Sequence, residues 1–214
     1  MKNGDFILID YIGRVVETGE VFDLTVESVA KKEGIFNENY NYKPILVIVG
    51  AGMVIPGVER RLKQMKPGEE LTFIVDPDEA FGKRDIKLIK VFHISRFLQQ
   101  KIDPKPGDYV EINGIRARIS SVSGGRVRVD FNHPLAGKKL QYTVKIVKEI
   151  KGTREKVKAI LEKYGIASEI QIKEGNLILK VKQKPNEVVQ KLIKDIIKKW
   201  VNEIKSVKFK VTKN

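Results

Sequence analysis

The sequence predicts an α+β fold, and three observations carry this prediction. Residues 4–16 carry apolar side chains on both faces of an extended chain, and apolar side chains alternate along residues 140–150; both patterns are typical of β-strands. The apolar run 45–49 leads through a glycine-rich turn into an amphipathic helix at 58–65. Residues 151–214 then have the order helix, strand, strand, helix, strand, which makes a small α+β domain.

The strand at 4–16 carries apolar residues on both faces, which predicts a central place in a sheet. A turn at 18–20 leads into a second strand at Val21. Residues 26–43 are rich in Lys, Glu and Asn, and they predict a polar excursion before the sheet resumes at Ile45.

The turn at residues 50–58 (GAGMVIPGV) is the point around which the first part of the chain is organised. Val58, Leu62 and Met65 recur at i, i+4 and i+7, so the helix that follows has one apolar face. The glycines permit a tight corner, which places the backbone amide of Ile55 at the lip of an apolar surface. Taken alone, this stretch is explained equally well as a packing corner.

Four motifs in order give this turn a context. They are Y-x-G at 11–13, V-F-D at 21–23, V-I-x-G-x-E at 54–59 and A-F-G at 80–82, and with them the chain resembles the FKBP family of peptidyl-prolyl cis-trans isomerases. The segment 132–138 (NHPLAGK), with the alternating strand after it, looks like the SlyD branch of that family. The resemblance covers about residues 1–150 and implies an antiparallel sheet wrapped on a short helix.

The resemblance also implies an apolar pocket for proline, in which aromatic rings enclose the proline and the amide of Ile55 holds the substrate backbone. Asp23 would orient Tyr11 or meet the substrate carbonyl, and Phe81 stands where Tyr is commoner, which implies weaker ligand binding with activity kept. Judged singly, each ring fits ordinary core packing equally well, and His133 fits a turn. The implied catalytic residues are Tyr11, Phe22, Asp23, Ile55, Phe81 and Tyr142, with substrate contacts from Ile45, Val54, Val58, Ala80, His133 and Leu135.

Residues 86–131 have a β pattern of their own, with strands at 109–112, 115–122 and 126–131 and a hairpin signal at Asn113-Gly114. The resemblance implies that they form a small all-β insert-in-flap domain that binds unfolded chains. An RNA-binding barrel is the alternative, because four arginines alternate along these strands at 116, 118, 126 and 128. The expected contacts to an unfolded chain are Leu88, Ile89, Phe92, Phe97, Leu98 and Tyr109.

Residues 151–214 form a third predicted domain, of a kind that some archaeal long forms of the family carry. They hold 17 Lys and Arg against 7 Asp and Glu, which is +10 of the net charge of +14. This balance suggests RNA or the ribosome as an acidic partner, while a solvated lysine-rich surface explains it as well. The second helix has an apolar stripe that fits internal packing or a homodimer; the stripe consists of Val189, Leu192, Ile193, Ile196, Trp200 and Ile204.

Composition limits the chemistry. The chain has no cysteine and two histidines, so we expect no disulfide, no cofactor and no metal site. It has no run of 18 apolar residues and no apolar leader, so we expect no membrane contact and a cytoplasmic location.

The sequence therefore predicts an isomerase domain at 1–85 and 132–150, an insert at 86–131 and a basic domain at 151–214. The predicted function is X-Pro isomerisation in unfolded or nascent polypeptides, with chaperone activity in the insert. The alternative is a nucleic-acid or ribosome-binding module that uses the basic domain.

Overall fold

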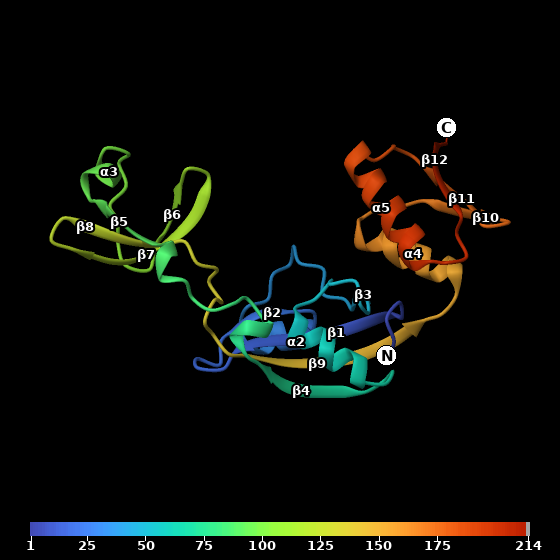
Figure 1. Ribbon diagram of the computed structural model, residues 1–214, viewed down its shortest axis with the longest axis horizontal. Coiled ribbons are helices and arrows are strands. Elements are labelled where there is room, and N and C mark those ends of the chain that lie inside the picture. Colours follow the sequence, from blue (N-terminus) through green and yellow to red (C-terminus); the bar gives the residue numbers. More distant parts are fainter. Residues whose placement is uncertain (213–214) are drawn as a thin grey trace. The chain divides into compact units, whose positions relative to one another are not determined.

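The computed structural model describes residues 1–212, and the chain divides into two compact units. The first unit comprises Met1–Val75 and Leu140–Asn214, and the second comprises Asp76–Lys139. Figure 1 labels the helices and strands of both. The mixture of antiparallel sheets and a few helices confirms the predicted α+β class.

A five-stranded sheet forms the body of the first unit. Strand β1 (Phe6–Val15) is central, and β9 (Leu140–Ile150) pairs with it antiparallel along its whole length. Strand β4 (Glu70–Val75) extends the sheet beyond β9. The other edge of β1 is shared by β3 (Ile45–Ile48) and β2 (Val21–Leu24). The central position of β1, predicted from its two apolar faces, is confirmed.

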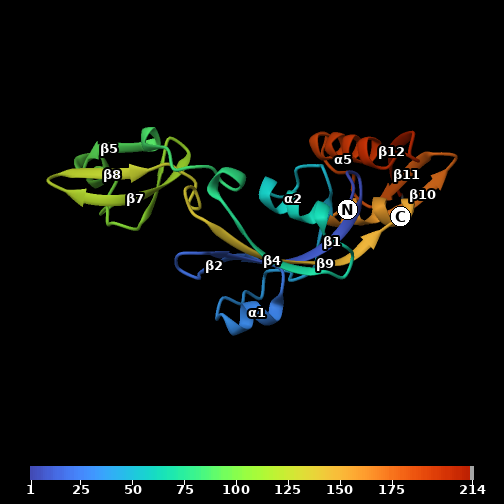
Figure 2. The ribbon, with the colours of Figure 1, turned by 60° about the horizontal axis from the view of Figure 1, so that its bottom comes forward.

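Two helices accompany this sheet, and Figure 2 shows them on opposite sides of it. Helix α2 (Pro56–Gln64) has Pro56 in its first turn and buries Val58 and Leu62. Helix α1 (Glu27–Lys32) lies within residues 26–43, for which the sequence predicted only a polar excursion. One apolar residue of α1 is buried, so the hydrophobic periodicity that announces a helix is absent.

Residues 151–212 confirm the predicted order of elements. It is α4 (Thr153–Lys163), β10 (Glu169–Lys173), β11 (Asn176–Val181), α5 (Glu187–Trp200) and β12 (Ser206–Val211). Strand β11 pairs antiparallel with β10 and parallel with β12. The Asn186 side chain caps α5 by accepting a hydrogen bond from the amide of Val189 at 2.9 Å.

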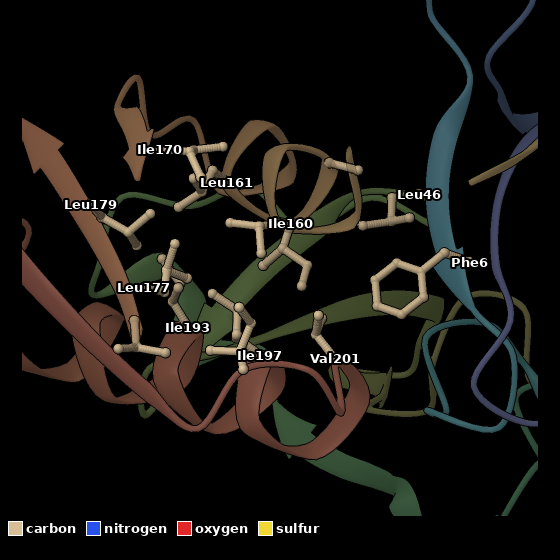
Figure 3. Close-up of a cluster of buried hydrophobic side chains, with 14 of the residues drawn as sticks. Phe6, Leu46, Ile160, Leu161, Ile170, Leu177, Leu179, Ile193, Ile197 and Val201 are labelled. Carbon is tan, nitrogen blue, oxygen red and sulfur yellow. The ribbon is translucent and has the colours of Figure 1, made fainter. Parts of the chain in front are cut away.

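The hydrophobic core of this region is continuous with residues of the five-stranded sheet (Figure 3). Ile160, Ile193 and Ile197 are fully or almost fully buried in one cluster with Phe6 and Leu46. The boundary expected near residue 151 therefore lies inside one compact unit. The division into three domains remains a proposal about function.

The apolar stripe of α5 faces this core, although its composition differs from the prediction. Ile193 and Ile197 form its centre and are fully buried, whereas Leu192 is 42% exposed. Leu192 lies about 100° around the helix from Ile193, which places it at the margin of the buried face. Because the stripe packs within the chain, its apolar character is explained without a second copy.

The second unit contains a four-stranded antiparallel sheet in the order β5-β8-β7-β6. The strands are β5 (Ile89–His93), β6 (Tyr109–Ile112), β7 (Ile115–Ser123) and β8 (Arg126–Asp130). The short helix α3 (Ser95–Leu98) follows β5, and 3-10 turns occupy Pro77–Glu79 and Ile86–Leu88. Both residues of the Asn113-Gly114 turn have positive φ, which confirms the predicted two-residue hairpin.

No helix among residues 1–212 is long and apolar enough to cross a membrane.

Candidate functional site

The first feature of the site is a hydrogen bond between Tyr11 and Asp23. Tyr11 lies on β1 and Asp23 on the neighbouring β2, and the Tyr11 hydroxyl donates to Asp23 Oδ2 at 2.6 Å. Thr25 fixes the backbone here, because its hydroxyl accepts from the amide of Tyr11 at 2.9 Å and donates to Asp10 Oδ1 at 2.8 Å. Asp23 therefore orients the Tyr11 ring, which is one of the two roles that the sequence suggested.

Tyr11 belongs to a group of four aromatic rings. We call this group the aromatic cluster, and it consists of Tyr11, Phe22, Phe73 and Tyr142. Tyr142 is central, since its ring centroid lies 5.7 Å from Phe22 in an edge-to-face arrangement, 6.3 Å from Tyr11 and 6.4 Å from Phe73. Pairing explains the assembly: on β9 Tyr142 stands opposite Phe73 of β4, and opposite Gly13 of β1. The cluster is thus built by four strands, of which β1 and β2 are close in sequence and β4 and β9 are distant from them.

Gly13 makes room for the Phe22 ring. A Cβ atom at Gly13 would lie 2.5 Å from Cζ of Phe22, a distance that no folded protein tolerates without movement. The absence of a side chain at this position therefore lets the Phe22 ring lie against β1 and reach the edge of Tyr142.

We expect Gly13→Ala to displace the Phe22 ring, to lower the free energy of unfolding by about 1–3 kcal/mol as other overpacked sites do, and to lower isomerase activity. Urea unfolding and a peptide isomerisation assay measure the two effects. In a Gly13→Ala, Phe22→Ala double variant the two losses of stability should be less than additive, because the clash is removed. Full additivity would contradict this reading of Gly13.

Both tyrosines of the cluster have raised pKa values. Burial raises the pKa of Tyr11 far above its ordinary value, and the hydrogen bond to Asp23 and the charge of Asp23 raise it further. Burial, together with the negative charge of Asp23, raises the pKa of Tyr142 to about 12. At neutral pH the cluster therefore presents apolar rings and un-ionised hydroxyl groups.

This shift predicts a loss of stability at high pH. An unfolded tyrosine ionises near its ordinary pKa of 10.0, whereas folded Tyr142 retains its proton to about 12. The contribution to stability is complete below pH 10 and is lost as the pH rises toward 12. We expect the free energy of unfolding to fall across this window and Tyr142→Phe to weaken the fall. Titration of Tyr142 at its ordinary pKa, followed by tyrosinate absorbance, would contradict the burial argument.

Tyr40 is a neighbour of the site that sequence reasoning missed. Partial burial, together with the negative charge of Asp23, raises the pKa of Tyr40. Tyr40 packs edge-on against Tyr42 at 4.8 Å, and Tyr42 stacks on Phe36 at 5.5 Å. No periodic pattern marks these residues, and a Tyr-rich stretch within a polar segment was the available signal. Phe73 was likewise predicted as part of a strand, with no role at the site.

The remaining predicted residues of the first unit lie around α2 and β3. Ile55 is the residue immediately before α2, with Val54 beside it, and both are half-buried. Ile45 opens β3 and pairs with Ile9 of β1. Val58 is 3% exposed and packs in the core, so it offers almost no open surface to a substrate.

Four of the residues predicted to line the proline pocket belong to the second unit: Ala80, Phe81, His133 and Leu135. The rings of Phe81 and His133 are stacked in parallel, with centroids 4.2 Å apart. His133 also completes a turn, since its Nδ1 accepts from the amide of Leu135 at 3.2 Å. The amide of Gly137 donates to the carbonyl of Gly82 at 2.8 Å, which joins the segment that holds Ala80 and Phe81 to the one that holds His133 and Leu135. Tyr11, Phe22, Asp23 and Tyr142 thus form one group, and Phe81 and His133 form another.

The expected contacts of the insert differ in exposure. Leu88, Leu98 and Tyr109 are 43%, 54% and 46% exposed, whereas Ile89 and Phe92 are half-buried. Phe97 does not fit the expectation: it is 3% exposed and forms part of the core of the insert, with its ring edge-on to Phe92 at 6.2 Å. Helix α3 turns Phe97 inward and leaves Leu98 at the surface, so these neighbours have different environments.

Among residues 1–212, no group of three or more His, Asp or Glu side chains is arranged to hold a metal ion.

Comparisons with known proteins agree with this geometry. Residues 1–94 match the family of FKBP-type peptidyl-prolyl cis-trans isomerases, and residues 90–135 match the FKBP26 IF domain. The short-type peptidyl-prolyl cis-trans isomerase of Methanocaldococcus jannaschii is 38% identical over 146 residues, which cover 68% of this chain and 92% of that protein.

Two bacterial relatives are more distant. The FKBP-type 16 kDa peptidyl-prolyl cis-trans isomerase of Escherichia coli K12 is 32% identical over 50% of this chain and 74% of its own length. The SlyD isomerase of Helicobacter pylori is 27% identical over 57% of this chain and 69% of its own. The chain therefore belongs to the family of FKBP-type peptidyl-prolyl cis-trans isomerases, enzymes that act on proline-containing polypeptides.

Proposed function

We propose that the aromatic cluster of the first unit, together with Asp23, holds the proline of an X-Pro bond during its isomerisation. The observation that carries this proposal is the convergence of Tyr11, Phe22 and Phe73 on Tyr142, beside a carboxylate that fixes Tyr11. A flat, apolar proline ring fits a wall of rings better than a polar side chain does, because aromatic faces and edges offer large apolar contact areas.

Rotation about the X-Pro bond has a barrier of about 20 kcal/mol, since resonance gives the C–N bond partial double-bond character. The twisted state loses that resonance, and its carbonyl is less polar than in either planar state. An apolar surface that excludes water therefore stabilises the twisted state relative to the planar ones. No nucleophile or general base takes part, and the hydroxyl groups of Tyr11 and Tyr142 are un-ionised at neutral pH.

Asp23 acts on the substrate through Tyr11 in this proposal. Its carboxylate accepts a hydrogen bond from the Tyr11 hydroxyl at 2.6 Å, so the phenol ring is held in one orientation before the substrate arrives. A preorganised ring loses little conformational entropy on binding, which favours the complex.

We further propose that the second unit captures unfolded polypeptide. Its surface exposes apolar side chains that a folded domain normally buries, including Ile86 at 81%, Ile115 at 56% and Leu98 at 54% exposure. Ala80, Phe81, His133 and Leu135 supply further contacts from the segments that lead into and out of the insert. A chain held there presents its prolines to the cluster at a raised effective concentration.

Titration with a proline tetrapeptide, followed by nuclear magnetic resonance, tests the location of the site. We expect the aromatic resonances of Tyr11, Phe22 and Tyr142 to shift, and those of Trp200 on α5 to stay in place. A tetrapeptide with Ala in place of proline is the control and should cause much smaller shifts. Shifts confined to residues outside the aromatic cluster would show that proline binds elsewhere.

A further inference from the structure

One face of the sheet in the insert carries four exposed arginines, which we call the arginine face: Arg116, Arg118, Arg126 and Arg128. Val127 and Val129 alternate with the two arginines of β8, and Ala117 and Ile119 alternate with those of β7; all four are buried in the core of the insert. Because successive side chains of a strand point to opposite faces, the four arginines share the solvent side of the sheet.

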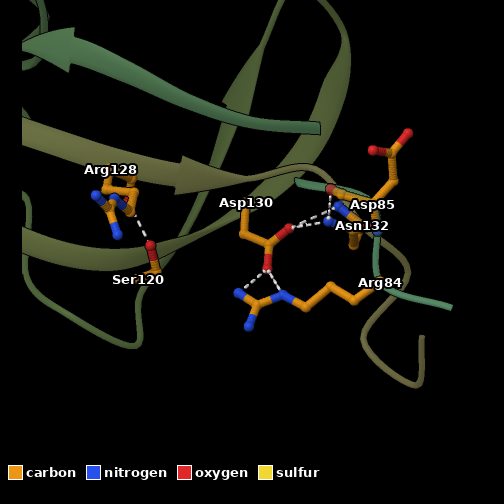
Figure 4. A network of polar contacts seen from close by, with 6 residues as sticks. All are labelled: Arg84, Asp85, Ser120, Arg128, Asp130 and Asn132. Atoms are coloured by element: carbon orange, nitrogen blue, oxygen red, sulfur yellow. Dashed lines mark hydrogen bonds and ion pairs between the residues drawn. The ribbon is translucent and has the colours of Figure 1, made fainter. Parts of the chain in front are cut away.

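The charges of the arginine face are not neutralised within the protein. None of the four guanidinium groups forms an ion pair with a carboxylate of residues 1–212. Asp130 stands opposite Arg118 in the β7–β8 register, but its carboxylate is held by Arg84, whose Nε lies 2.9 Å away, and by the side chain of Asn132 at 2.7 Å (Figure 4).

Asp130 is firmly committed to these partners. Partial burial opposes its ionisation, yet hydrogen bonds from Asn132 and Arg84 outweigh that effect and lower the pKa of the carboxyl. Glu111 stands opposite Arg116, but the Arg116 guanidinium lies 4.3 Å above the Tyr109 ring. Asp130 and Glu111 therefore do not neutralise the arginines that they stand opposite. The arginine face keeps an excess of positive charge.

Apolar surface lies among these charges. Val91 of β5 stands opposite Arg128 and is 56% exposed, and Tyr109 of β6 stands opposite Arg118 and is 46% exposed. Each of these two apolar side chains therefore has an arginine as its cross-strand neighbour. At one end of the face, Arg84, Arg118 and Asp130 help to line a depression of about 290 Å³.

We propose that the arginine face makes the insert selective for unfolded segments that carry Asp or Glu among apolar residues. This inference rests on the proposed capture of unfolded chains by the second unit and names the class of chain that is captured. The arginine forks match carboxylates in shape and charge, while the exposed Val91 accepts the apolar side chains between them.

A polypeptide fits this face better than a single-stranded nucleic acid does. Nucleic-acid surfaces stack bases on open aromatic rings, whereas the ring of Tyr109 is already covered by Arg116.

The test uses the full chain and three labelled unfolded peptides with identical apolar residues and no proline, in which the polar positions are Glu, Gln or Lys. Fluorescence anisotropy measures the affinity of each. We expect the Glu peptide to bind about tenfold more tightly than the Gln peptide at low salt, and the Lys peptide to bind most weakly, because several exposed pairs each contribute modestly. The preference should shrink at high salt, as exposed charges are screened.

Variants assign the effect to the face. Arg126→Gln, Arg128→Gln should reduce the preference for Glu over Gln to about twofold, and the Arg→Lys pair should keep an intermediate preference since it retains charge without the fork. The matched control is Lys191→Gln, Lys194→Gln on α5, which removes the same charge from the first unit and should leave the preference unchanged.

Each outcome bears on a different claim. If the wild type binds none of the three peptides, the proposed capture function itself fails. If it binds all three equally, capture stands and the selectivity is wrong. A loss in the α5 control as large as in the arginine variant reduces the effect to net charge and overturns the proposal. Tighter binding of an unstructured oligouridine than of the Glu peptide, lost in the same arginine variant, makes the face a nucleic-acid surface instead.

Discussion

Removal of residues 86–130 is expected to leave the turnover of a proline tetrapeptide within about twofold of the wild-type value, while catalysis of protein refolding falls by a factor on the order of 10 to 100. A tetrapeptide offers a single short segment to bind, so it gains nothing from capture by the insert. An unfolded protein loses the tether that raises the local concentration of its prolines. Parallel assays with a chromogenic tetrapeptide and a proline-limited refolding protein measure both rates.

The control for this deletion is Leu98→Ser combined with Tyr109→Ser, which keeps the insert and removes two exposed apolar contacts. The double variant should lower refolding catalysis in part and leave tetrapeptide turnover unchanged. Circular dichroism establishes that each variant is folded. Equal losses in the two assays would show that the insert supports the catalytic site itself, and the division of labour between the two units would be wrong.

Tyr11→Phe and Asp23→Ala are each expected to lower tetrapeptide turnover by about tenfold, since a hydrogen bond to a charged group contributes about 1.5–3 kcal/mol. Both changes remove the same 2.6 Å bond between the Tyr11 hydroxyl and Asp23 Oδ2. The double variant should therefore be scarcely slower than the slower of the two single variants. Values of kcat/KM for the four proteins complete the cycle.

Additive losses in this cycle would mean that Asp23 and Tyr11 act separately, with Asp23 touching the substrate directly. A matched control is Thr18→Ala, which removes a hydroxyl that accepts a 3.3 Å hydrogen bond from Glu20 in the turn before β2. That turn lies outside the aromatic cluster, so loss of this hydrogen bond should leave tetrapeptide turnover unchanged.

The sequence predicted much of the fold because several elements carry strong local signals. The two apolar faces of β1 and the Asn113-Gly114 turn each depend on a few residues and were placed correctly. Helix α1 has no such signal, because its short length and polar composition leave a single buried residue. Which residues lie at the margin of the apolar stripe of α5 depends on how the helix is rotated against the core. No local sequence pattern shows that rotation.

The candidate site shows the same division. Motifs named Tyr11, Phe22, Asp23 and Tyr142, and the structure brings these four residues together. Phe73 joins these residues because it stands opposite Tyr142. That position depends on the register between β4 and β9, which the sequence does not show. The burial of Phe97 likewise follows from how α3 packs on its sheet, so a list of apolar residues in the insert included it wrongly.

The most direct test of the central claim is the refolding of a protein whose slow phase is limited by proline isomerisation, with wild type and Phe22→Ala compared at equal concentration. Phe22 contacts Tyr142 edge-on at 5.7 Å, and its loss opens the wall of the cluster. We expect the wild type to accelerate the slow phase and Phe22→Ala, folded by circular dichroism, to fail by about tenfold or more, as loss of a large aromatic contact costs well over 1.4 kcal/mol. Equal acceleration by both proteins would contradict the assignment of catalysis to the aromatic cluster.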